Sequence, residues 1–136
     1  MPGVQDPTET FHTLMPFTKT LGITVVTYTA DEVRARLAWD PTLCTAGGVL
    51  HGGVLMSLAD STGGACAFLN LPAGATGTTT VESKTNFLRA VREGYVDGRS
   101  RPLHKGRTLL VIETDLLDDR DRLVARVTQS QLVLGG

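Results

Sequence analysis

One short segment holds the residue types best suited to acyl chemistry. His51-Gly52-Gly53 stands directly before an apolar run, and Asp60 follows nine residues after the histidine. Two glycines at a helix start leave backbone N–H groups open to a ligand, in the positive field of the helix dipole. An oxyanion that develops on a carbonyl would be stabilised there. We favour the Gly52 N–H as its donor.

Asp60 is the candidate acidic group. Helical spacing places it two turns beyond the glycines, on the side that carries Ser57 and Gly64 rather than on the apolar stripe. A carboxylate near an oxyanion site can act as a general base on water or attack the carbonyl itself. Alone, the glycine pair could be a plain helix entry and Asp60 a solvated residue. Their combination favours a site for acyl transfer.

Several function classes lack support in the sequence. There is no G-x-S-x-G elbow, Walker loop or G-x-G-x-x-G fingerprint, which argues against serine hydrolases and nucleotide-binding proteins. The net charge is -1, without a long block of one sign, so we expect neither nucleic-acid binding nor a membrane-binding patch. Cys44 and Cys66 lack metal-ligand spacing, and we expect no metal site, no disulfide and a cytoplasmic location.

The elements that must position these residues follow from hydrophobic periodicity. With 136 residues, 41% of them hydrophobic, the chain suits one globular domain over 11–136, and residues 1–10 are expected to be disordered. Residues 54–69 form the only long helix expected. Gly63 and Gly64 within it each cost roughly 1 kcal/mol relative to alanine, so we expect a sheet to approach closely there.

Alternating residues predict strands on both sides of this helix. A strand pair is expected at 23–27 and 33–39, and an antiparallel meander is expected at 78–88, 95–104, 107–117 and 123–134. Before the first strand, Thr8 can cap a short helix that packs as a lid. A single helix among these strands favours an α+β fold in which the sheet curls around the helix. The exposed strand edges would need an oligomer to cover them.

Three segments in order carry a family resemblance. The run 51–60, the segment 80–87 and His104-Lys105-Gly106-Arg107-Thr108-Leu109 resemble the PaaI-type (phenylacetic acid degradation-related) hotdog-fold thioesterases. The resemblance extends from about Phe17 to the C-terminus. It implies a hotdog fold and a homodimer or homotetramer with active sites at the subunit interface. It also implies hydrolysis of acyl-CoA thioesters without a metal or an organic cofactor.

The resemblance also implies residue roles. Asp60 matches the acidic catalytic residue, Gly52 the backbone donor to the thioester carbonyl, and His51 the histidine beside it. Thr80 matches a Ser/Thr position that orients water. The chain departs from the family at Thr45, where members commonly have Asn or Gln six residues before the histidine. A hydroxyl at this position can still form a hydrogen bond to substrate or water.

Substrate contacts are expected at both the backbone and the basic side chains. Gly53 keeps the helix start open to the thioester. Arg89, Lys105 and Arg107 could pair with the phosphates of CoA, although each could equally belong to a solvated rim.

We therefore expect an acyl-CoA thioesterase for an aryl or medium-chain acyl group. The alternative is a noncatalytic acyl-CoA-binding or sensing protein, which Thr45 favours and Asp60 opposes. A hotdog dehydratase is disfavoured because its HxxPGxP-like turn is absent. The acyl group, the choice between dimer and tetramer, and the role of Asp60 as base or nucleophile stay open.

Overall fold

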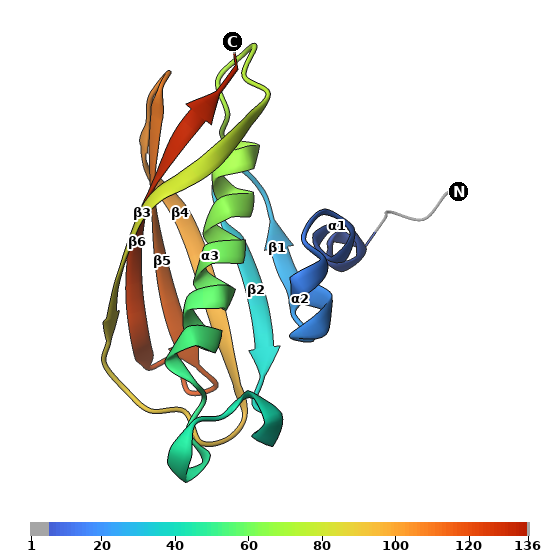
Figure 1. Ribbon diagram of the computed structural model, residues 1–136, viewed down its shortest axis with the longest axis vertical. Helices are drawn as coiled ribbons and strands as arrows, with labels where there is room; N and C mark the ends of the chain where they lie inside the picture. The colour runs from blue at the N-terminus through green and yellow to red at the C-terminus, as the bar shows by residue number, and fades with distance from the viewer. Residues whose placement is uncertain (1–5, 136) are drawn as a thin grey trace.

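The computed structural model describes residues 6–135. A six-stranded antiparallel sheet wraps around one long helix, and two short helices lie beside the first strand (Figure 1). This is the α+β architecture expected from the sequence. The elements are α1 (Pro7–Leu14), α2 (Pro16–Thr20), β1 (Thr24–Tyr28), β2 (Val33–Ala38), α3 (Gly52–Leu69), β3 (Gly77–Phe87), β4 (Tyr95–Lys105), β5 (Leu109–Asp118) and β6 (Leu123–Leu134), with 3-10 turns at Pro41–Leu43 and Ala46–Gly48.

The order of the strands corrects the expected four-strand meander. The sheet runs β1-β2-β4-β5-β6-β3, so β4, β5 and β6 are consecutive neighbours but β3 pairs with β6. One edge of β4 is already paired with β2 and the other with β5. The chain leaving α3 therefore finds its free partner edge on β6. Alternation along the strands could not reveal this pairing, because it is non-local.

β3 forms one end of the sheet. Its 11 residues are exposed or only half-buried, and its second edge has no strand partner within residues 6–135. Figure 1 shows it crossing in front of the sheet beside α3. A long unpaired edge of this kind is a ready template for pairing with another chain.

α3 begins two residues earlier than expected, because His51 caps it. The Nδ1 atom of His51 accepts a hydrogen bond of 2.8 Å from the Gly53 N–H. A side chain on Gly53 would place its Cβ 2.9 Å from that nitrogen, so the cap requires glycine there. The expected apolar stripe of α3 faces the sheet, with Leu55, Leu58 and Cys66 buried. No helix within residues 6–135 is long and apolar enough to span a bilayer.

The two glycines inside α3 have different surroundings. A Cβ on Gly63 would overlap the side-chain amide of Gln129 on β6, which confirms the expected close approach of the sheet. A Cβ on Gly64 would meet no atom within 4 Å. The same expectation is therefore wrong for Gly64, which points away from the sheet.

The N-terminal helix begins inside the segment expected to be disordered. Asp6 caps α1 by accepting a hydrogen bond of 2.9 Å from the Thr8 N–H, so Thr8 is not the cap. The Thr8 hydroxyl instead accepts a hydrogen bond of 2.9 Å from the Val25 N–H and joins α1 to β1. Residues 6–10 are thus ordered, and residues 1–5 lie outside the described part. Phe11 is buried against Tyr28 in an edge-to-face contact with ring centroids 5.9 Å apart.

Candidate active site

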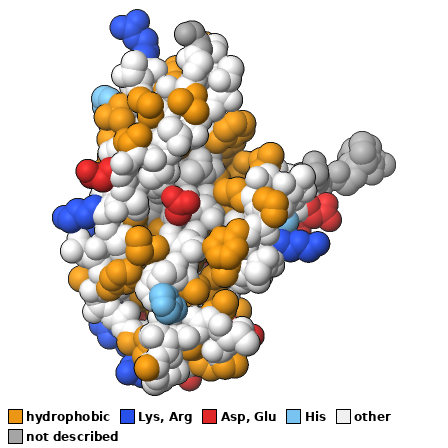
Figure 2. All heavy atoms as spheres, in the orientation of Figure 1, with side chains coloured by type: hydrophobic (Ala, Val, Ile, Leu, Met, Phe, Trp, Pro, Cys, Tyr) orange, Lys and Arg blue, Asp and Glu red, His pale blue; other side chains and the backbone are white. Residues whose placement is uncertain are grey.

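Asp60 lies on the face of α3 that the sheet leaves uncovered. It lines two adjoining hollows of about 460 Å³ and about 280 Å³. Gly64 lines the larger and Ser57 the smaller, which confirms that all three residues share one side of the helix. Figure 2 shows an acidic side chain at the centre of this face, over α3, with hydrophobic side chains on both sides. Asp60 is the only acidic residue of α3.

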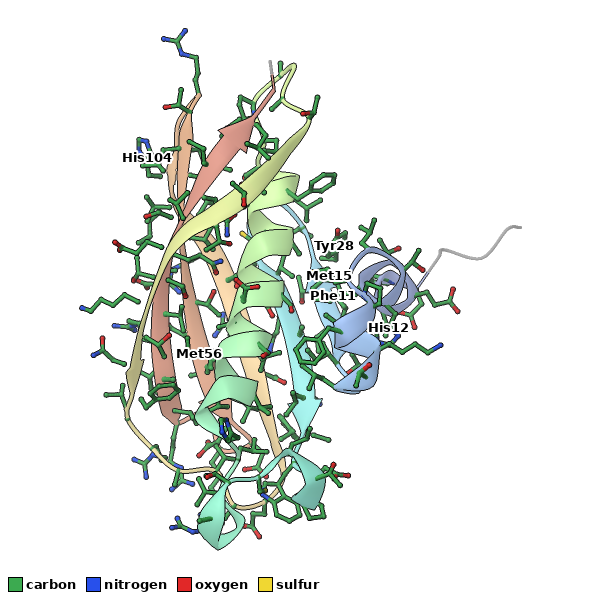
Figure 3. The ribbon with its side chains drawn as sticks, in the orientation of Figure 1. Phe11, His12, Met15, Tyr28, Met56 and His104 are labelled. Carbon is green, nitrogen blue, oxygen red and sulfur yellow. The ribbon has the colours of Figure 1, made fainter. Side chains whose placement is uncertain are left out.

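The larger hollow has mainly apolar walls. α1 contributes Phe11 and Leu14, its C-cap contributes Met15, β1 contributes Tyr28, and α3 contributes Phe68. Figure 3 shows Phe11, Met15 and Tyr28 gathered where α1 meets the edge of the sheet. α1 thus closes one side of the hollow, in the position expected of a lid. Polar groups enter the hollow from β3 and β6: Thr78, Thr79, Thr80 and Gln131.

The surroundings of Asp60 make its carboxyl group a stronger base than usual. The residue is exposed in the single chain, yet desolvation by the surrounding protein raises the pKa of its carboxyl above the ordinary value. A hydrogen bond from the Thr80 hydroxyl lowers the pKa in the opposite direction and is the smaller effect. Asp60 and Thr80 therefore lie beside each other on the same hollow.

The helix start forms a second cluster of expected site residues. Gly52 occupies the first helical position, where the backbone N–H has no acceptor within the helix. Gly52 shares a hollow of about 430 Å³ with Thr45 and Arg89. The ring of Phe87 lies over Gly52, with its Cζ 3.3 Å from the position of an added Cβ. His51 holds this turn in place through the cap to Gly53.

Lys105 and Arg107 lie apart from both clusters. They flank the turn between β4 and β5, and Arg107 lines a hollow of about 830 Å³ with His104 and the loop that follows α3. Figure 3 shows His104 at the upper end of the sheet, away from α1. This turn is near the C-terminal end of α3, whereas Gly52 is at its N-terminal end.

One chain does not place the expected donor and the expected acid on the same carbonyl. Gly52 and Asp60 are eight residues apart on one straight helix, which corresponds to roughly 12 Å at 1.5 Å per residue. They also line different hollows. A thioester group is far smaller than this separation, so the two residues of one chain cannot both contact it.

The sequence analysis did not identify Gln131 and Thr78, two polar residues that line the hollow beside Asp60. Gln131 of β6 is buried, and it hydrogen-bonds to Thr80 and to Thr78 of β3. The available signal was the alternation of β6, where Gln129 and Gln131 fall in phase with the inward-facing Val127. A buried amide at such a position must find partners or lose stability.

The residues 6–135 contain no cluster of three or more His, Cys, Asp or Glu side chains that could hold a metal ion. Cys66 is buried in α3, and burial raises the pKa of its thiol to about 11. A thiol with this pKa is protonated near neutral pH, so Cys66 is not a reactive nucleophile.

Comparison with known proteins identifies the family. Residues 47–125 match the model of the thioesterase superfamily, and this span includes the helix start, Asp60 and Thr80. The chain belongs to the thioesterase superfamily. It is therefore a thioester hydrolase by family. Among relatives of this superfamily member is "1,4-dihydroxy-2-naphthoyl-CoA hydrolase" of Escherichia coli, 32% identical over 93 residues that cover 68% of each chain.

Solved structures of relatives have the same fold. The "Putative esterase Rv1847/MT1895" of Mycobacterium tuberculosis superposes with a TM-score of 0.86 at 33% identity, over 90% of this chain and 98% of its own. A thioesterase of Haemophilus influenzae superposes with a TM-score of 0.86 at 28% identity, over 94% and 90%. The Escherichia coli PaaI protein superposes with a TM-score of 0.84 at 19% identity, which shows the shared fold. These matches confirm the hotdog fold.

Proposed function

We propose that this superfamily member hydrolyses an aryl- or medium-chain acyl-CoA to the free acid and CoA. The observation that carries the proposal is the position of Asp60, which lines a largely apolar hollow together with Thr80 and whose pKa is raised by burial. A carboxylate with a raised pKa is a better base for water near neutral pH than an ordinary one.

The reaction uses two positions on the thioester. The Gly52 N–H donates to the carbonyl oxygen and stabilises the negative charge that develops on it. Asp60 removes a proton from water while the water oxygen attacks the carbonyl carbon, and Thr80 orients that water. The C–S bond of the tetrahedral intermediate then breaks and CoA leaves as thiolate. The same geometry permits direct attack by Asp60, followed by hydrolysis of the anhydride.

A second copy of the chain supplies the missing half of each site. Gly52 and Asp60 of one chain are too far apart for one carbonyl, and the exposed edge of β3 offers a surface for pairing. We therefore propose a homodimer, or a homotetramer built from it, in which Asp60 of one subunit works with Gly52 of another. β3 carries Thr80, so an interface along this strand would pass beside the acid.

The hollow beside Asp60 suits an aromatic or medium-length acyl group. Phe11, Tyr28 and Phe68 provide apolar and aromatic surface around a space of about 460 Å³. The Escherichia coli relative is named for an aromatic CoA thioester, which agrees with this choice. At the other end of the substrate, Arg89, which lines the hollow beside Gly52, is our candidate for contact with the phosphates of CoA. Lys105 and Arg107 lie near the opposite end of α3 and would add charge to the same site only if another subunit brought them to it.

The first test measures CoA release from a panel of aryl and straight-chain acyl-CoAs. The Asp60→Asn variant keeps the shape of the side chain and removes the base, so we expect it to lose turnover by at least about 100-fold. An Asp60→Asn protein that is folded, oligomeric and as active as the parent would refute the assignment. Tight acyl-CoA binding without CoA release by the parent would identify a sensing protein.

A matched pair of variants tests the Gly52 N–H. Proline is well tolerated at the first helical position, and the preceding His51 already has the extended backbone that proline requires. Gly52→Pro removes the N–H, and Gly52→Ala adds a similar Cβ next to Phe87 but keeps it. We expect kcat to fall by roughly 100- to 1,000-fold in Gly52→Pro alone. Equal losses in both variants would show that crowding by Phe87, rather than the donor, is responsible.

A further inference from the structure

Side-chain hydrogen bonds join Gln131 of β6 to two threonines of β3 that lie beside the acid. The Thr78 hydroxyl lies 3.1 Å from Gln131 Oε1, and Gln131 Nε2 lies 2.6 Å from the Thr80 hydroxyl oxygen. The Thr80 hydroxyl is near enough to the Asp60 carboxyl to lower the pKa of that group. All four residues line the same hollow. The acid and a buried amide from another element of the fold therefore meet at one hollow, with Thr80 between them.

The charge on Asp60 fixes the direction of these bonds. An ionised carboxylate only accepts hydrogen bonds, so a hydrogen bond between Thr80 and Asp60 requires the single hydroxyl proton of Thr80 to point at Asp60. The Thr80 oxygen is then free to accept, and the NH₂ group of Gln131 is the neighbour that donates to it. The carbonyl of Gln131 lies 3.1 Å from the Thr78 hydroxyl, whose single proton is shared between it and the Leu132 carbonyl oxygen at 3.0 Å.

We propose that Gln131 is a positioning residue for the hydrolysis of the thioester, because its amide holds the Thr80 hydroxyl with its proton directed at Asp60. The inference rests on the proposed role of Asp60 in catalysis. Gln131 touches neither the carbonyl nor the water. It acts by restricting a hydroxyl that would otherwise rotate, so that Thr80 is a fixed donor to the carboxylate.

Gln129 shows that a buried amide on this face does not find partners automatically. It lies two residues before Gln131 on the same strand and is equally buried, yet neither its Oε1 nor its Nε2 has a hydrogen-bond partner within the described chain. Gln129 packs against Gly63 instead. The two amides therefore form a natural comparison, since one is connected to Asp60 and the other is not.

Loss of the Gln131 amide has a predictable electrostatic effect. A freely rotating Thr80 hydroxyl donates to Asp60 for less of the time, so the stabilisation of the carboxylate decreases and the pKa of Asp60 rises further. The other ionisable residue that lines these two hollows is Tyr28, and burial raises its pKa as well. Tyr28 stays neutral over the acid range, and the titration there reports on Asp60.

The test is an NMR titration of the Asp60 carboxyl carbon in the intact oligomer, assigned by its absence from Asp60→Asn. We expect an upward shift of the titration midpoint in Gln131→Met and no shift in Gln129→Met, which is the matched control. The acid limb of kcat/KM should move to higher pH in Gln131→Met as well, with kcat at low pH falling several-fold and KM little changed. Thr80→Val should reproduce the NMR shift and Thr80→Ser should reverse it.

The outcomes separate this inference from the proposed function. An unshifted titration in Gln131→Met overturns the inference, even if Thr80→Val shifts the titration and Asp60→Asn is inactive. Equal shifts in Gln131→Met and Gln129→Met also overturn it, because they would indicate a general change in packing. Full turnover by Asp60→Asn would refute the proposed function, and the NMR shift would still report whether Gln131 orients Thr80. If Gln131→Met does not fold, Gln131→Leu, which also lacks the amide, takes its place in the same titration.

Discussion

At the scale of the single residue, the surroundings of Asp60 destabilise its ionised carboxylate and make it a stronger base. Apolar neighbours from α1 and β1 withdraw water from its carboxyl, which raises the pKa, and Thr80 compensates only in part. The ionised carboxylate is therefore less stable in the folded chain than in the unfolded one.

This environment predicts that the acid lowers stability at neutral pH. The folded pKa of Asp60 lies above the unfolded value, so its favourable contribution is complete below the unfolded pKa and is lost as pH rises through the folded pKa. Asp60→Asn should therefore keep or raise the melting temperature at pH 7 and should give no such advantage at pH 3. Thermal melts of both proteins at the two pH values check this. A clearly lower melting temperature for the variant at pH 7 would contradict it.

His51 has a structural role as the cap of α3, which is separate from the site role that the resemblance implied. His51 Nδ1 accepts the Gly53 N–H at the start of α3. His51→Ala should lower the free energy of unfolding by about 1 kcal/mol, whereas His51→Asn should retain most of the cap because asparagine is a preferred capping residue. Urea unfolding of the three proteins measures the difference. Identical losses in both variants would argue against the cap.

At the scale of elements, α3 has one face against the sheet and another open to the hollow. Gly63 lies on the first face, where the Gln129 amide leaves no room for a methyl group. Gly64 lies on the second, where it lines the hollow beside Asp60. The two glycines therefore differ in their surroundings: packing against Gln129 requires a glycine at position 63, whereas position 64 has room for a side chain.

These surroundings predict opposite effects of the same substitution at adjacent positions. Gly63→Ala should lower the free energy of unfolding by about 1 to 3 kcal/mol, because Gln129 must move in a packed interior. Gly64→Ala should raise it by up to about 1 kcal/mol, because alanine favours the helix and meets no neighbour. Chemical denaturation of both variants gives the comparison. Destabilisation by Gly64→Ala would show that this position is covered, for example by a second subunit.

At the scale of the whole molecule, one chain holds two incomplete half-sites. The donor at Gly52 and the acid at Asp60 lie on the same helix in separate hollows, and the long exposed edge of β3 runs beside the acid. An arrangement with twofold symmetry would place each half-site opposite its complement and would create two equal sites.

Shared sites predict complementation between inactive subunits. Asp60→Asn and Gly52→Pro should each be inactive alone, but a hybrid dimer contains one site with both residues intact. Random exchange of subunits should therefore restore about a quarter of the parental activity, since half of the dimers are hybrids with one good site. The measurement is CoA release after unfolding and refolding the mixture. Persistent inactivity of a mixture shown to contain hybrids would place each site within one chain.

Local sequence patterns were sufficient to locate the elements and the candidate residues along α3. Periodicity predicted the long helix and the four later strands to within two residues of their ends, because side-chain alternation is a local property. The spacing of Gly52 and Asp60 set their separation for the same reason. Together with the downstream segments, it also indicated the family that the comparison confirmed.

Only the tertiary structure showed which strands pair and which side chains from distant segments are in contact. The pairing of β3 with β6 brings Thr80 next to Gln131, although the two are 51 residues apart in the chain. The same fold places Lys105 and Arg107 near one end of α3 and Arg89 near the other. Contacts of this kind depend on which strand edges remain free, a global condition that no local pattern encodes.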